Sequence, residues 1–277
     1  MIFIVCALHC EAKPIVERYR LVVDREASFP VFKGDGITLV VTGIGKILTA
    51  SAMSYLYARY NEPFFSGWLN VGIAGMKSSP LGELYNINKI TEQSSGANWY
   101  PVRLPVLDSA FNCPLITVDK PDNQYIDDFA YDMEASAFAL TALRYSPVEL
   151  MQVVKIVSDN ENNSMENIDK KFVTKLVSSR INEINNVVTA LGESVSMIEQ
   201  AYAESGIFAQ CVDTWHFSEY QKKQLSRLVQ QWEALDDSAD FFRLEGFSTG
   251  KQVVEFLNKA LSETEIVFGD LFGDLND

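Results

Sequence analysis

The sequence predicts an α/β protein in which helices cover both faces of a central sheet, followed by a helical extension at the C-terminus. Two observations lead to this prediction. Short apolar runs alternate with helical patterns over the first 160 residues, which is typical of a layered α/β domain. The strongest of these runs are continuously apolar, as expected of strands that are buried on both faces.

The expected strands are short, and most are rich in β-branched or aromatic residues. They cover, in order, 3–8, 37–42, 67–72, 84–90, 115–118 and 151–157.

Helical patterns lie between the expected strands. One begins near Lys13, which puts Pro14 in a first turn where its missing N–H is harmless. A second, over 46–60, is rich in alanine and ends before Pro63. A third, over 133–145, stops before Pro147, because the residue that precedes a proline disfavours helical geometry.

The chain beyond residue 168 is expected to be helical throughout. Apolar residues recur at steps of three and four over 169–191, which predicts one long amphipathic helix that ends at Gly192. A further apolar stripe comprises Leu225, Leu228, Val229, Trp232 and Leu235. These patterns predict two domains, 1–192 and 193–277.

The charge balance limits the classes of partner. The formal net charge is −14, and the last 47 residues carry eleven acidic against three basic side chains. Such a surface argues against nucleic acid or an anionic membrane as the main partner. No window approaches the ~20 apolar residues of a membrane helix. A neutral small molecule is the partner that fits best.

The four cysteines and two histidines form no CxxC pair, so we expect no structural zinc site, and no metal or organic cofactor. Free thiols are typical of the cytoplasm, where we expect the protein to reside. The apolar N-terminus lacks a basic segment and is interpreted as a strand rather than a signal peptide.

Acidic residues and glycines follow several of the expected strands. Ligands of open α/β sheets bind at the carboxyl ends of the strands, where small residues let the backbone approach them. Taken singly, Glu11 could stabilise a helix dipole, Asp159 could cap a turn, and Glu134 could be a surface residue in a first helical turn. Together they favour one shared site.

Four segments carry a resemblance to a known family. They are Ala7-Leu8-x-x-Glu11, Thr42-Gly43-Ile44-Gly45-Lys46, Asn70-x-Gly72-x-Ala74-Gly75, and the pair Asp132-Met133-Glu134-Ala135 with Val157-Ser158-Asp159. In this order and spacing they resemble the nucleoside phosphorylase superfamily over 1–192. The nearest groups are the methylthioadenosine/S-adenosylhomocysteine nucleosidases and the futalosine hydrolases. The resemblance implies a three-layer α/β/α sandwich with a central mixed, twisted sheet.

The resemblance also implies hydrolysis of the N-ribosyl bond of a purine nucleoside. Asp159 matches the acid that protonates the leaving base, Glu11 matches the carboxylate that activates water, and Glu134 matches the residue that holds the ribose 2′- and 3′-hydroxyls. The implied substrate-binding residues are Met133, Glu134, Ser158, Gly43, Gly72, Ile73, Ala74 and Gly75.

Two departures from the family pattern leave alternatives open. Ile73 stands where the family often has a hydroxyl residue, and no arginine lies in a matching segment. A phosphate dianion needs several donors, so water is favoured over phosphate as nucleophile, with a phosphorylase as the alternative. The aromatic residue that stacks on the base has no counterpart in the matching segments. Trp99, Tyr100 and Phe111 are the candidates.

The region between Glu83 and Tyr131, which helps to form the dimer in relatives, is short here, so a homodimer is an open expectation. The extension has no counterpart in the family's core, and a protein partner bound by 193–277 is a second expectation. A nucleoside-sensing protein without turnover is the alternative to an enzyme.

Overall fold

The structure is a computed structural model that describes residues 1–60, 65–104, 111–121, 128–164, 166, 168–203, 206–235 and 246–263. The chain divides into two compact units, Met1–Met197 and Ile198–Asp277, called here unit 1 and unit 2. Each unit is described by itself.

Four parallel strands form the centre of unit 1. They are β1 (Ile2–Cys6), β4 (Ile37–Val41), β5 (Gly67–Met76) and β10 (Met151–Asp159). β1 lies between β4 and β5, and β10 pairs with the other edge of β5. Nearly all of their residues are buried, as the continuous apolar runs predict. Because the strands are parallel, their carboxyl ends meet at one edge of the sheet.

The remaining strands make the sheet a mixed one. They are β2 (Val22–Asp24), β3 (Val31–Gly34), β6 (Leu84–Glu92), β7 (Asn98–Trp99), β8 (Phe111–Thr117) and β9 (Ala130–Asp132). Along the sheet the order is β10-β6-β8-β9-β5-β1-β4-β3-β2. Since β10 also pairs with β5, the first five of these strands close into a ring.

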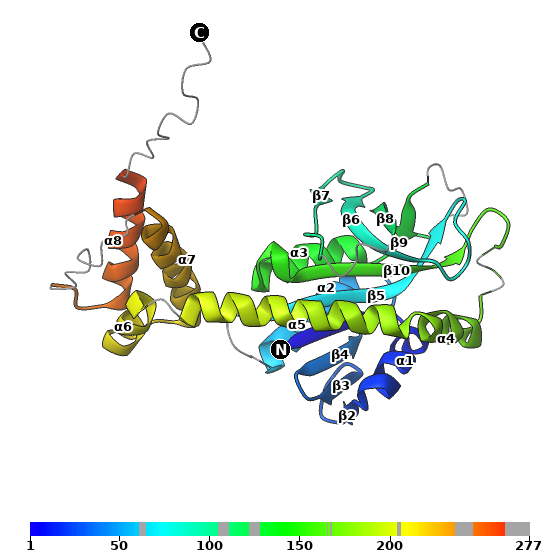
Figure 1. The fold of residues 1–277 in the computed structure, drawn as a ribbon, viewed down its shortest axis with the longest axis horizontal. Coiled ribbons are helices and arrows are strands. Elements are labelled where there is room, and N and C mark those ends of the chain that lie inside the picture. Colours follow the sequence, from blue (N-terminus) through cyan, green and yellow to red (C-terminus); the bar gives the residue numbers. More distant parts are fainter. Residues whose placement is uncertain are drawn as a thin grey trace, which may run out of the picture. The chain divides into compact units, whose positions relative to one another are not determined.

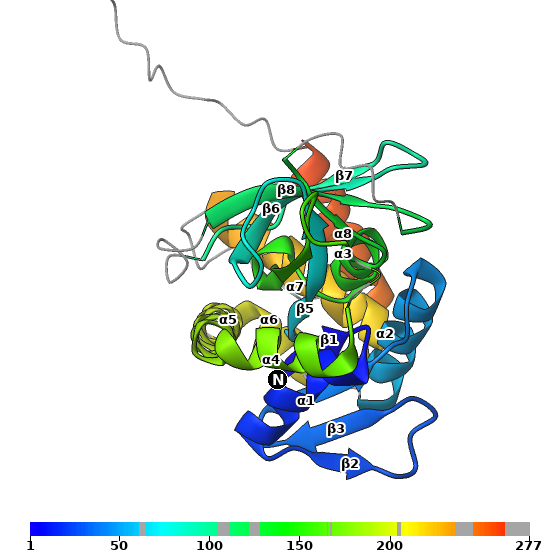
Figure 2. The same ribbon diagram turned by 90° about the vertical axis from the view of Figure 1, so that its right-hand side faces the viewer.

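Helices cover both faces of the sheet (Figures 1 and 2). They are α1 (His9–Tyr19), α2 (Lys46–Tyr60), α3 (Ala135–Tyr145), α4 (Lys170–Ser179) and α5 (Ile181–Ala203), with a short 3-10 turn at Val148–Leu150. α2 packs against α3, and α1 against α4. The predicted α/β/α sandwich with a mixed central sheet is confirmed.

Pro14 lies in the middle of α1 rather than in its first turn, because the helix begins four residues earlier than expected. A proline at this position leaves the Cys10 carbonyl without its helical donor. The Thr174 hydroxyl of α4 donates to that oxygen at 3.2 Å. The hydrogen bond therefore compensates for the proline and joins α1 to α4.

The single long helix expected over 169–191 is wrong in two respects. The helix is interrupted at Arg180, whose ψ of 14° leaves helical geometry. The second part, α5, then continues through Gly192 to Ala203. A glycine inside a helix costs only about 1 kcal/mol, and buried Leu191 and Val195 beside it anchor the helix.

Unit 2 contains α6 (Gly206–Thr214), α7 (Glu219–Leu235) and α8 (Gly250–Glu263). Its core comprises Cys211, Phe217, Leu225, Leu228, Val229, Trp232, Val253, Val254 and Leu257. The predicted stripe on α7 is thus buried at four of its five positions, and the side chain of the fifth, Leu235, lies outside the described residues. Among the helices that the structure describes, none combines the length and apolar character needed to cross a membrane.

Candidate active site

A cavity of ≈ 260 Å³ opens in unit 1 at the carboxyl ends of β1, β5 and β10. Its lining is mostly apolar and includes four carboxyl groups, of which those of Glu11, Glu134 and Asp159 are expected there from the sequence. The lining residues are Ala7, Leu8, Glu11, Ile44, Ile73, Ala74, Gly75, Val118, Pro121, Tyr131, Asp132, Met133, Glu134, Ser158, Asp159 and Ile168. This combination of apolar walls and a few converging polar groups is typical of a small-molecule site.

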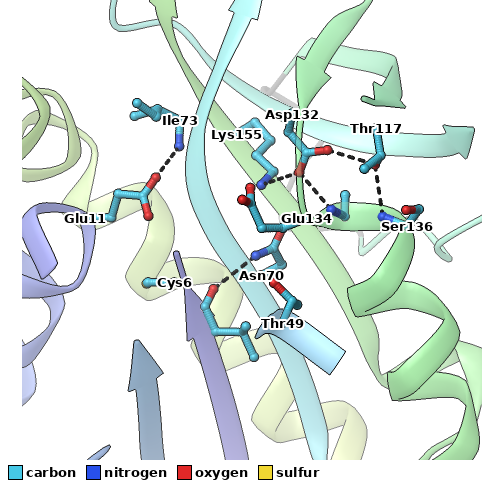
Figure 3. Close-up of polar contacts among 12 residues, drawn as sticks. Cys6, Glu11, Thr49, Asn70, Ile73, Thr117, Asp132, Glu134, Ser136 and Lys155 are labelled. Atoms are coloured by element: carbon cyan, nitrogen blue, oxygen red, sulfur yellow. Dashed lines mark hydrogen bonds and ion pairs between the residues drawn. The ribbon is translucent and has the colours of Figure 1, made fainter. Parts of the chain in front are cut away.

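Glu11 lies in the first turn of α1 and is buried. One carboxylate oxygen accepts a hydrogen bond from the Leu8 N–H at 2.8 Å, and the other accepts one from the Ile73 N–H at 2.9 Å (Figure 3). Burial raises the pKa of Glu11, although the Ile73 N–H and nearby Lys155 act in the opposite direction. Each oxygen keeps a lone pair that can accept a further proton or hydrogen bond.

Glu134 immediately precedes α3 and faces the same cavity together with Met133. One of its carboxylate oxygens accepts a hydrogen bond from the Gly45 N–H at 2.7 Å. Gly45 has a φ of 100°, which favours glycine and orients this N–H. Burial and then the charge of Asp132 raise the pKa of Glu134 to about 7. A carboxyl group in this state changes its charge near neutral pH.

Asp159 ends β10 and Ser158 precedes it, and both side chains are buried at the cavity. The Ser158 hydroxyl donates to an Asp159 carboxylate oxygen and lies 3.3 Å from the Ala74 carbonyl. The local register of β10 against β5 shifts between Val157 and Asp159. Such irregularities bend a strand and re-aim its side chains.

Eight of the ten sequence-predicted site residues line the cavity, and Gly43 and Gly72 do not. At Gly72 the close neighbours belong to the protein: a Cβ there would lie 3.1 Å from Glu11 Oε1 and 3.3 Å from Lys155 Nζ. Gly43 has a φ of 86° in the loop before α2. Gly72 thus leaves room for two protein side chains, and Gly43 has a backbone conformation that favours glycine, which sequence spacing alone does not distinguish from ligand contact.

Among the described lining residues, the aromatic one is Tyr131 of β9, which no sequence pattern singled out. The three expected candidates lie elsewhere. Trp99 packs against the core, and Tyr100 is 61% exposed. The Phe111 side chain lies outside the described residues.

Lys155 and Asp132 form an ion pair that sequence reasoning missed, with Lys155 Nζ 2.9 Å from Asp132 Oδ2. Both side chains are almost completely buried. A signal was present, since Lys155 interrupts the apolar run 151–157 and a buried lysine requires a partner. Within the described part of the chain, no group of three or more histidine, cysteine or acidic side chains could hold a metal ion.

No protein-family model matches the chain, and no curated protein matches its sequence. Solved structures share its fold at low identity. An MTA/SAH nucleosidase is 18% identical with a TM-score of 0.57, over 69% of this chain and 95% of that one. The 5′-methylthioadenosine nucleosidase of Arabidopsis thaliana is 15% identical with a TM-score of 0.59, over 69% and 95%.

The futalosine hydrolase of Helicobacter pylori strain 26695 is 15% identical with a TM-score of 0.56, over 68% of this chain and 97% of that one. The chain therefore has the fold that these nucleosidases and hydrolases share.

Proposed function

We propose that the protein hydrolyses the N-ribosyl bond of a purine nucleoside of the methylthioadenosine, S-adenosylhomocysteine or futalosine type. The observation that supports this most directly is that Glu11, Glu134 and Asp159 line the same cavity. The solved structures with the same fold are named for reactions of this class.

Breaking the bond sends its electron pair into the purine and leaves positive charge on the sugar. In the proposed reaction Asp159 gives a proton to the base as it leaves. Water forms the new bond to the sugar carbon and gives a proton to Glu11. General acid–base steps of this kind contribute roughly 10²–10⁴ in rate. The raised pKa of Glu11 suits a base, because it brings proton affinity closer to neutral pH.

Glu134 is proposed to hold the ribose diol. One of its oxygens already accepts the Gly45 N–H, and the remaining lone pairs can accept both sugar hydroxyls. Met133, which also lines the cavity, is proposed to pack against the sugar. Ser158 is proposed to orient Asp159 through their hydrogen bond.

Water is favoured over phosphate as the nucleophile because of the lining near Glu11. Among the described lining residues there is no arginine or lysine, and the partners of Glu11 there are the backbone N–H groups of Leu8 and Ile73. A phosphate dianion would face a carboxylate there without a cation to bind it, which is unfavourable.

The experiment is release of free base by the purified full-length chain from a panel of adenine and hypoxanthine nucleosides, followed by chromatography with and without phosphate. We expect phosphate-independent release that is lost in Glu11→Gln and Asp159→Asn. A matched control is Glu17→Gln, an exposed acid on the same helix as Glu11. Phosphate-dependent release would show a phosphorylase instead.

A nucleoside-sensing protein is the second candidate, because unit 2 has its own core and no sequence counterpart in the family segments. Thermal stabilisation by a nucleoside without release of base from any member of the panel would support sensing and contradict hydrolysis.

A further inference from the structure

Lys155 is a buried cation that the proposed reaction does not use. It points from β10 toward β9 and α3 (Figure 3), and its side chain is only 3% exposed. It pairs in register with Gly72 of β5. The missing side chain at Gly72 leaves room for Lys155 Nζ and Glu11 Oε1 together behind the cavity wall.

Asp132 holds the lysine and is itself firmly held. Its Oδ2 accepts the Ala135 N–H at 2.8 Å as well as pairing with Lys155, and its Oδ1 accepts the Thr117 hydroxyl at 2.8 Å. The Thr117 oxygen in turn accepts the Ser136 N–H at 3.0 Å. These bonds fix the start of α3, and with it the position of Glu134.

Lys155 faces acidic groups from several elements: Asp132 of β9, Glu134 before α3 and Glu11 of α1, with the buried thiol of Cys6 from β1 also near. Burial by itself lowers the pKa of Lys155, but the acids outweigh burial and raise it above its ordinary value. The lysine is therefore a permanent positive charge among three carboxyl groups. Without it, two or three negative charges would repel one another in a buried space.

We propose that Lys155 is a positioning residue, whose ammonium group, held by Asp132, favours the anionic forms of the Glu11 and Glu134 carboxyl groups without touching the nucleoside. The expected effect of Lys155 on turnover rests on the proposed function. Lys155 is not among the residues that line the cavity, so its effect passes through the two carboxylates that are. It is distinct from the acid and base that exchange protons with the substrate and water.

The test is the pH dependence of kcat/KM in Lys155→Met, which removes the charge and nearly keeps the volume. The acidic limb of this profile reports ionisation in the free enzyme. We expect the limb to move to higher pH by about one unit or more, since an opposite charge at close range lowers a carboxyl pKa by about that amount. An unchanged limb in the folded variant would overturn the proposal.

Lys46→Met is the matched control. Lys46 also pairs with acids, Glu92 at 2.7 Å and Asp119 at 2.5 Å, but neither acid lines the cavity. We expect its acidic limb to coincide with that of the wild type. An equal shift of the acidic limb in both variants would mean that the loss of any ion pair is sufficient to cause it. That result would overturn the specific role of Lys155.

Lys155→Met leaves Asp132 as an unpaired buried charge, so a second variant is needed in case it does not fold. Lys155→Met with Asp132→Asn removes both charges, while the side-chain amide oxygen that the second substitution introduces can still accept the Ala135 N–H. The double variant also removes the Asp132 charge that raises the pKa of Glu134, so the expectation concerns Glu11, whose carboxyl should titrate at higher pH than in the wild type because the cation that acts on it is gone. A downward shift or no shift would contradict the proposal.

A readout without turnover separates this proposal from the proposed function. The infrared absorption of protonated carboxyl groups is followed against pH, with Glu11→Gln and Glu134→Gln assigning the two bands. If the wild type releases no base from any nucleoside, the proposed function fails. The role of Lys155 is then decided by whether both bands in Lys155→Met, and the Glu11 band in the double variant, titrate at higher pH than in the wild type, as expected, or at the wild-type pH.

Discussion

Glu134→Gln should make the protein more stable at alkaline pH, although it removes a residue of the candidate site. Glu134 is buried, and burial together with Asp132 raises its pKa from 4.5 to about 7. Its hydrogen bond from the Gly45 N–H requires an acceptor oxygen, which glutamine also supplies. The substitution therefore removes the charge and keeps the contact.

The magnitude follows from the difference between the two pKa values, about 2.5 pH units. Because the folded state binds the proton more tightly, the contribution of Glu134 to stability is fully present below pH 4.5. It is lost as pH rises to about 7. At about 1.4 kcal/mol per pH unit, the loss is about 3 kcal/mol. The glutamine variant has no such loss.

The assay is denaturant unfolding of wild type and variant between about pH 4 and pH 8. We expect the unfolding free energy of the variant relative to wild type to increase by about 3 kcal/mol across this range. Glu17→Gln, at an exposed site on α1, is expected to run parallel to wild type. If the unfolding free energies of Glu134→Gln and wild type changed in parallel with pH, the inference that charged Glu134 destabilises the folded state would be refuted.

Three further outcomes are expected. Asp159→Asn should lower the rate of base release by roughly 10²–10⁴, measured in single turnovers, because it removes the proposed acid. Gly72→Ala should destabilise the fold by about 1–3 kcal/mol in denaturant unfolding and lower kcat/KM, since the new Cβ lies within 3.3 Å of Glu11 and Lys155. The exposed apolar residues of α2 and α3, among them Ile47 at 83%, are proposed as the contact of the expected homodimer, and if they are, Ile47→Lys should sediment as a monomer where the wild type sediments as a dimer.

The convergence of Glu11 and Asp159 could be predicted from the sequence because it depends on strand order and direction, whereas Glu134 follows β9, which is antiparallel to β5, and its place in the site was implied only by the family resemblance. Apolar runs identify the parallel strands, and the carboxyl ends of parallel strands meet at one edge. The same reasoning could not assign a role to Gly72. A glycine is needed at this position because the side chains of Glu11 and Lys155, from other elements, lie close to its Cα, and only the folded chain shows this proximity.

The Lys155–Asp132 ion pair could not be predicted from the sequence, because it too depends on contacts between separate elements. The two partners are far apart along the chain, and the pairing depends on how β9 and β10 each meet β5. A lysine in a buried strand indicates that an acid is near, but several acids were available. The interruption of the helix at Arg180 is similar, because that side chain turns to donate to the Gly82 carbonyl at 2.6 Å.

Glu134, proposed to hold the sugar, and Glu11, proposed to activate water, accept different numbers of backbone hydrogen bonds. This difference predicts that binding of the nucleoside depends on pH near neutrality. Glu11 accepts two backbone N–H groups, whereas Glu134 accepts one and has Asp132 beside it. With a pKa of about 7, Glu134 gains a proton just below neutral pH and can no longer accept both ribose hydroxyls. If only the anionic form binds, affinity should fall about tenfold per pH unit below about pH 7. Calorimetry with the slow variant Asp159→Asn measures this directly, and an affinity that stays constant from about pH 8 to about pH 5.5 would show that Glu134 does not hold the sugar as an anion.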